Sequence, residues 1–184
     1  MDLADLVSRA AHGDRASFAS LATQYIDRCY ALAYRILRDR DRAQDATQQA
    51  LIGAWRDLPK LRDPERFEAW LHRLVVHACY VEARGTRRWN ARFRIHAITT
   101  ETAPDPAYAV VDRAGLEDAF AQLTPEQRAV VVLHHHHGYP LTEIAEILGI
   151  PVGTARSRLF YAVRQLRIVL DPDSVSATPG ERSA

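Results

Sequence analysis

Hydrophobic residues recur along most of this chain with the spacing of helices, and there is little of the every-second-residue alternation that half-buried strands show. Three helix starts are marked by capping residues. Asp41 is expected to begin one helix, Asp63 followed by proline a second, and Thr124 a third with the spacing of a capping box. The pattern predicts an all-α protein.

The helical pattern fails across residues 95–111, where two prolines and several threonines are typical of a linker. We therefore expect two small helical domains, at residues 1–94 and 112–170, joined by a flexible linker. Residues 171–184 are polar and contain proline, which predicts a disordered tail. With 184 residues, of which 47% are hydrophobic, the chain is long and apolar enough to bury a core.

The segment LTEIAEILGIPVGTARSRLFYAVRQLR, residues 141–167, predicts two short helices around a corner at Gly149. Ala145 is small where the helices would cross, and Ile150 and Val152 are expected to return to the core. The second helix has an apolar stripe at Ala155, Leu159, Val163 and Leu166, and its other side carries Thr154, Arg156, Ser157, Phe160 and Tyr161. This arrangement favours a helix-turn-helix, whose second helix enters the DNA major groove, over a plain helical hairpin.

The net charge of +1 conceals two basic segments. Residues 147–170 contain four arginines and no acid, and residues 84–94 contain five arginines and no acid. An arginine run on a single helix is commonly just a solvated face, but each of these runs lies beside other signals. Both segments are therefore candidate sites for polyanions.

Several classes of protein and site are disfavoured. No apolar run reaches the roughly 18 residues needed to span a bilayer, and the first residues lack the features of a secretory signal, so we expect a cytoplasmic protein without membrane insertion. Cys29 and Cys79 form no CxxC pair and are expected to be buried thiols. The run from His134 to His137 points in four directions on a helix, so we expect surface histidines and neither a metal site nor a cofactor.

Three segments carry a family resemblance. LTPEQRAVVVLHHHHGYPLTEIAEILGIPVGTARSRLFYAVRQLR resembles region 4 of bacterial sigma factors of the extracytoplasmic-function (ECF) group, within the sigma-70 family. FASLATQYIDRCYALAYRILRDRDRAQDATQQALIGAW and RFEAWLHRLVVHACYVEARGTRR resemble region 2. The resemblance implies a promoter-specificity subunit, not an enzyme. Such a subunit binds the β′ clamp and β flap of core RNA polymerase, recognises the −35 and −10 promoter elements, melts DNA and is commonly restrained by an anti-sigma factor.

The resemblance also implies which residues act. Asp45, Gln48 and Gln49 would bind the polymerase clamp, with Gln49 standing where relatives usually have an acid. The −35 element would be read by Thr154, Arg156, Ser157, Phe160 and Tyr161, the last at a position that is often arginine.

For the −10 element, the resemblance implies a loop and a helix that capture an unpaired base and hold the strand with cations. His77 stands where relatives commonly have asparagine, and Trp70 is assigned to the core. The implied residues are Lys60, Arg62, Phe67, His77, Arg84, Arg87 and Arg88.

Two other functions stay open at this point. A free-standing helix-turn-helix regulator would need a dimerisation heptad or a ligand pocket, and the sequence indicates neither. A histidine-dependent metal enzyme would need a nucleophile, paired carboxylates or a phosphate-binding loop, which the sequence also does not offer.

Overall fold

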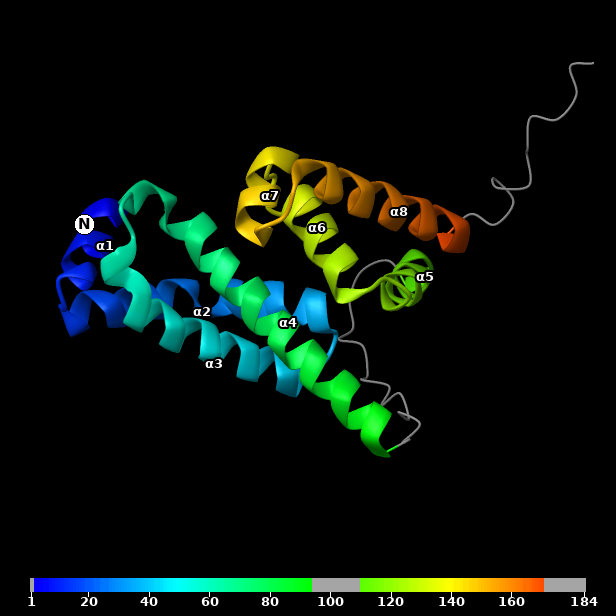
Figure 1. The fold of residues 1–184 in the computed structure, drawn as a ribbon, viewed down its shortest axis with the longest axis horizontal. Helices are drawn as coiled ribbons and strands as arrows, with labels where there is room; N and C mark the ends of the chain where they lie inside the picture. The colour runs from blue at the N-terminus through cyan, green and yellow to red at the C-terminus, as the bar shows by residue number, and fades with distance from the viewer. Residues whose placement is uncertain (1, 94–109, 171–184) are drawn as a thin grey trace, which may run out of the picture.

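The computed structural model describes residues 2–93 and 110–170, and side chains within residues 2–85 and 115–170 (Figure 1). All regular structure in these ranges is helical, as the sequence predicts. The predicted linker, except for its last two residues, and the predicted tail lie outside the described residues.

The first domain comprises α1 (Leu3–Ala11), α2 (Arg15–Leu37), α3 (Arg40–Asp57), two short 3-10 turns, η1 (Leu58–Lys60) and η2 (Pro64–Arg66), and α4 (Phe67–Phe93). Helices α2, α3 and α4 pack on one another and α1 packs on α2. The predicted cap at Asp41 is wrong: the side chain of Asp39 accepts a hydrogen bond from Arg42 N and begins α3. Asp63 caps η2, and α4 starts after that turn.

The second domain comprises α5 (Val110–Ala121), α6 (Pro125–His135), α7 (Leu141–Leu148) and α8 (Val152–Leu170). The capping box predicted at Thr124 is present: its side chain accepts from Gln127 N, and the Gln127 side chain accepts from Thr124 N. This box satisfies main-chain donors at the start of α6.

Helices α7 and α8 form the helix-turn-helix corner at Gly149. This residue has φ 64° and ψ 40°, a left-handed conformation that costs residues with a Cβ about 1–2 kcal/mol. Ala145 is 4% exposed where the helices pack, as expected. Val152 does not return to the core, because it is 37% exposed at the start of α8.

Replacing Gly149 with alanine should lower the free energy of unfolding by about 1 kcal/mol. A Cβ at this position would meet no atom within 4 Å, so the cost is backbone strain alone. Gly149→Asn is the matched control, because asparagine tolerates this conformation better and should cost less. Chemical denaturation measures both, and equal losses for the two variants would contradict this account.

The two domains pack directly against each other. Helix α6 packs against α2, and α7 packs against α4. Residues 128–133 of α6 are all buried, so this helix is covered on every side. One hydrophobic cluster contains Leu32 and Ile36 of α2 together with Val130 and Leu133 of α6. We call the contact between the domains the interdomain seam.

Candidate nucleic-acid interface

The first turns of α8 present the side chains expected to face DNA. Arg156 and Ser157 are exposed, Thr154 is half-buried, and Phe160 and Tyr161 are 61% and 57% exposed. The Phe160 and Tyr161 rings lie edge to face, with centroids 5.5 Å apart. These side chains therefore form a continuous exposed surface of cationic, hydroxyl and aromatic groups.

The buried face of α8 holds that surface in place. Ala155 and Ala162 are fully buried, and Leu159, Val163 and Leu166 are half-buried. Ala162 was not predicted to belong to the buried stripe, although it lies one helical turn from both Leu159 and Leu166. This packing fixes α8 on α5, α6 and α7 and leaves its opposite face to solvent.

Cations continue along α8. Arg156, Arg164 and Arg167 are exposed and make no ion pair with any residue that the structure describes. Arg158 differs from them: it is half-buried and acts electrostatically on Tyr80 of α4, whose pKa burial raises and Arg158 lowers. Three arginines of α8 are therefore available to a polyanion, while the fourth is turned toward the first domain.

Helix α3 presents a second surface. Asp45, Gln48 and Gln49 are exposed, while the opposite face, at Ala43, Ala46, Thr47, Ala50 and Ala54, is buried. Ile52 and Trp55 on the same helix are 52% and 38% exposed. The sequence analysis did not single out these two, although apolar residues that fall off a buried stripe are the signal for them. Exposed apolar side chains among amides and a carboxylate suit a protein interface.

The residues expected at the −10 element divide into three groups: exposed, buried and not described by the structure. Lys60, Arg62, His77 and Arg84 are exposed, with Lys60 paired to Asp57 at 2.6 Å. Phe67, which the resemblance implies at the −10 element, is instead 2% exposed and lies in the core of the first domain, against Tyr25 at a ring distance of 5.3 Å. The side chains of Arg87 and Arg88 lie outside the described residues. Trp70 is half-buried against the core, as expected.

Arg66 is a cation in this loop that the sequence analysis did not single out. It lies in η2 and pairs with Glu146 of α7 at 2.8 Å and with Glu143 at 3.9 Å. Two carboxylates of the helix-turn-helix therefore form ion pairs with Arg66, which lies between Arg62 and α4. In this closed arrangement, any phosphate approaching Arg66 would compete with them.

Arg128 of α6 connects the two domains through hydrogen bonds to main-chain oxygens. Its guanidinium donates to Leu123 O at 2.8 and 3.0 Å and to Ile36 O of α2 at 2.6 Å. The side chain has no carboxylate partner among the described residues, and burial together with Arg38 and Arg42 lowers its pKa to about 10. A buried cation held by carbonyls alone stabilises this contact only while those hydrogen bonds are intact.

The prediction of surface histidines holds only in part: His135 and His136 are exposed, whereas His134 and His137 are half-buried. Helix α6 ends at His135, and His134 Nδ1 is 3.0 Å from Tyr139 O. His137 turns into the interdomain seam, where its ring centroid is 4.4 Å from that of His72 of α4. Within the described residues, no three histidine, cysteine, aspartate or glutamate side chains are grouped to hold a metal ion.

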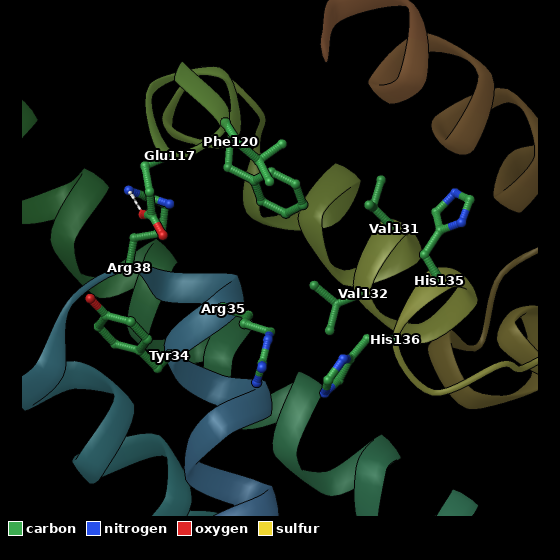
Figure 2. A pocket seen from close by; sticks show the side chains of 10 residues that line it. Tyr34, Arg35, Arg38, Glu117, Phe120, Val131, Val132, His135 and His136 are labelled. Atoms are coloured by element: carbon green, nitrogen blue, oxygen red, sulfur yellow. Dashed lines mark ion pairs between the residues drawn. The ribbon is translucent and has the colours of Figure 1, made fainter. Parts of the chain in front are cut away.

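A groove of about 360 Å³ marks one end of the interdomain seam (Figure 2). The close view shows Arg35 of α2 facing Val132 of α6 and His136, which follows α6, across it. A 2.7 Å ion pair between Arg38 and Glu117 of α5 closes one side. The domains are thus joined at this end by an ion pair and by hydrophobic contact.

Two further expectations concern the thiols and the membrane. Cys29 and Cys79 are both buried and free, and burial raises the pKa of each thiol to about 12. No helix in the described part of the chain has the length and apolar character needed to cross a bilayer.

Comparison with known proteins places these surfaces in a family. Residues 21–89 match the family model described as sigma-70 region 2, and residues 119–167 match sigma-70 region 4. The first match covers α3 and most of α4, and the second covers the helix-turn-helix. Both domains of the fold therefore have a counterpart in the same family.

Whole-length relatives agree. The chain is 34% identical over 172 residues to the ECF RNA polymerase sigma factor SigL of Mycobacterium tuberculosis, covering 89% of this chain and 94% of that protein. It is also 34% identical to SigM of the same species, covering 91% and 84% of the two chains.

Solved structures show the same fold. Sigma factor RpoE of Bartonella quintana, in complex with the anti-sigma factor NepR, superimposes with a TM-score of 0.72 at 23% identity, over 85% of this chain and 98% of that one. CnrH, in complex with the cytosolic domain of CnrY, gives a TM-score of 0.63 at 24% identity, over 93% and 98%. With matching region 2 and region 4 domains and whole-length relatives of one kind, this chain belongs to the ECF group of the sigma-70 family of RNA polymerase sigma factors.

Proposed function

We propose that this sigma factor directs transcription initiation through three separate surfaces. The exposed face of α8 reads the −35 element, the loop around η1 and η2 together with α4 engages the −10 element, and α3 binds the polymerase. The observation that carries the proposal is the acid-free, outward face of α8 on a helix-turn-helix scaffold. Its action with RNA polymerase would place the protein in the cytoplasm.

At the −35 element, Arg156 is the residue best placed to read a base edge. Its side chain is exposed near the start of α8, the part of a recognition helix that enters the major groove. Arginine bonds guanine bidentately, whereas Ser157 and Thr154 can bond a phosphate or a base. Tyr161 supplies a hydroxyl where relatives often have a cation, so we expect a different preference at that contact.

At the −10 element, Lys60, Arg62 and Arg84 would hold the strand, and His77 would face a base. Arg87 and Arg88 belong to the same proposal through the sequence alone. Phe67 is left out of the DNA-binding set because it is buried. Arg66 is added, because it lies in the same loop and is exposed.

For the polymerase, we propose that Asp45, Gln48 and Gln49 contact the β′ clamp, with Ile52 and Trp55 adding apolar area. The second domain would contact the β flap. Buried apolar anchors surrounded by hydrogen-bonding groups are typical of stable protein interfaces.

Asp45→Ala combined with Gln48→Ala should weaken association with core polymerase at least tenfold, about 1.4 kcal/mol, without lowering the melting temperature. Both side chains are exposed and make no hydrogen bond with another residue that the structure describes. Asp5→Ala with Gln24→Ala, which removes an exposed acid and an exposed amide from α1 and α2, is the matched control. Competition for core polymerase against the wild-type protein measures the effect. Full-strength binding by the α3 double variant would remove α3 from the interface.

While the two domains are packed together, the protein cannot bind the −35 and −10 elements at the same time. By their names, the −35 and −10 elements lie about 25 base pairs apart, which is about 85 Å of DNA at about 3.4 Å per base pair. In the structure the helix-turn-helix packs on α4 and pairs with Arg66. We therefore propose that the domains separate when the sigma factor joins polymerase. We also propose that an anti-sigma factor can restrain it, since the solved neighbour RpoE is in complex with the anti-sigma factor NepR.

Transcription in vitro with core polymerase on a library of genomic promoters tests this function. We expect transcripts that depend on the sigma factor and share −35 and −10 sequences. A free-standing regulator would instead bind its DNA tightly and specifically without polymerase at physiological salt, and that result would overturn the proposal.

A further inference from the structure

A cluster of three aromatic side chains joins the domains at the centre of the interdomain seam. His72 of α4 is 1% exposed, and its Nδ1 shares a 3.0 Å hydrogen bond with the Tyr139 hydroxyl. The His137 ring meets the His72 ring edge to face, with centroids 4.4 Å apart. His72 belongs to the first domain and both partners to the second, so separation of the domains breaks the contacts of His72 with Tyr139 and His137.

In the closed form, the surroundings of the cluster make protonation of the imidazoles unfavourable. His137 Nε2 is buried and has no hydrogen-bond partner among the described residues. A protonated ring would bury an N–H donor without an acceptor, and two protonated rings at this distance would repel each other.

The charged groups around the cluster do not compensate. Arg28 and Arg35 of α2 and His136 of the second domain all act to lower the pKa of one or both rings. Glu68 of α4 is paired with Arg28 at 3.7 Å. The other titratable groups that border the cluster or act on Tyr139 are Asp27 and Tyr25 of α2, His134 of α6, whose Nδ1 lies 3.0 Å from Tyr139 O, and Glu143 of α7, which faces Arg66 at 3.9 Å.

We propose that His72, His137 and Tyr139 form a proton-sensitive latch, which holds the second domain on the first while both imidazoles are neutral and releases it when they bind protons. The latch rests on the proposed function only in that separation of the domains is the step leading to promoter binding. It adds to that function a dependence of the closed state on proton concentration.

The sign of the effect follows from the two states. Burial, first of all, lowers the pKa of His72 to about 3 and that of His137 to about 4, whereas exposure in the open form returns each to 6.5. The open form therefore binds more protons, so the closed form is stable above pH 6.5 and loses stability as the pH falls below it. At pH 5.5, protonation of one histidine shifts the equilibrium between closed and open forms about tenfold toward the open form. Protonation of both histidines shifts it about a hundredfold, compared with a pH at which both rings are neutral.

Energy transfer between dyes at Ser20→Cys on α2 and Thr142→Cys on α7 measures the separation in the full chain. Both positions are exposed, and the native thiols are buried with pKa values of about 12, so labelling is selective near neutral pH. We expect transfer to fall between pH 6.5 and 5 while the helical circular dichroism signal stays constant. Constant transfer, or a fall only when helicity is lost, would overturn the latch.

Substitutions of the histidines test which side chains bind the protons that open the domains. His72→Gln with His137→Gln should abolish the pH dependence, while His135→Gln, an exposed member of the same run, should leave it unchanged. A double variant that remains pH-sensitive contradicts the proposal. His137→Lys places a charge in the seam at neutral pH and should open the domains at pH 7.5, whether or not the double variant folds; a closed protein would contradict the latch. Because no polymerase or DNA is present, these failures would not bear on the sigma function.

Discussion

Arg128→Ala is expected to lower the free energy of unfolding by about 3 kcal/mol, since it leaves two buried carbonyl oxygens without their donors and opens a cavity. Those oxygens belong to Leu123 and to Ile36, which lies 92 residues away in the other domain. For a chain of this size the melting temperature should fall by about 6–12 °C. Thermal and chemical denaturation measure the change.

Arg40→Ala provides the matched control, because Arg40 is an exposed arginine at the start of α3 and should change stability by less than about 0.5 kcal/mol. Arg128→Met keeps most of the volume without the donors, so its loss should lie between those of the other two variants. If Arg128→Ala were as stable as Arg40→Ala, the hydrogen bonds across the seam would contribute nothing to the closed fold.

Arg156→Ala should weaken holoenzyme binding to the preferred −35 sequence by about 1–3 kcal/mol and relax the preference at one base pair. Arg167→Ala, further along the same helix, should weaken binding to all sequences about equally and reduce the salt dependence, as loss of a phosphate contact does. Both side chains are exposed and make no ion pair with a described residue, so a difference between them reflects their positions on DNA.

Binding of holoenzyme to a set of single-base −35 variants at two salt concentrations separates these outcomes. An Arg156→Ala protein with uniformly reduced affinity and unchanged base preference would mean that α8 only grips the DNA backbone.

Local features were predictable because their causes lie within a few residues. The capping box at Thr124 involves a partner three positions away, and the corner at Gly149 depends on one residue's backbone freedom. The same locality explains the error at Asp41. Two aspartates two positions apart both suit a helix start, and the actual cap, Asp39, is distinguished only by its hydrogen bond to Arg42 N.

Helix faces were also readable, but with less precision. Spacing identified the outward side of α8 and the polar side of α3, because helical periodicity alone separates a buried stripe from a solvated one. Periodicity did not decide Phe67, which the family resemblance assigned to the −10 element and whose place at the start of α4 suits either a loop contact or the core. Packing against Tyr25 from another helix puts the ring inside.

The interdomain seam could not be foreseen. The apolar run at residues 128–133 indicates a helix covered all round, yet periodicity does not say that α2 provides the cover. His72 and Tyr139 are 67 positions apart, and no local pattern links them. The chain therefore specifies its helices, caps and exposed faces through short-range spacing. The burial of Arg128 and His137, and with it their chemistry, arises from the docking of one domain on the other, because desolvation depends on every surface that meets there.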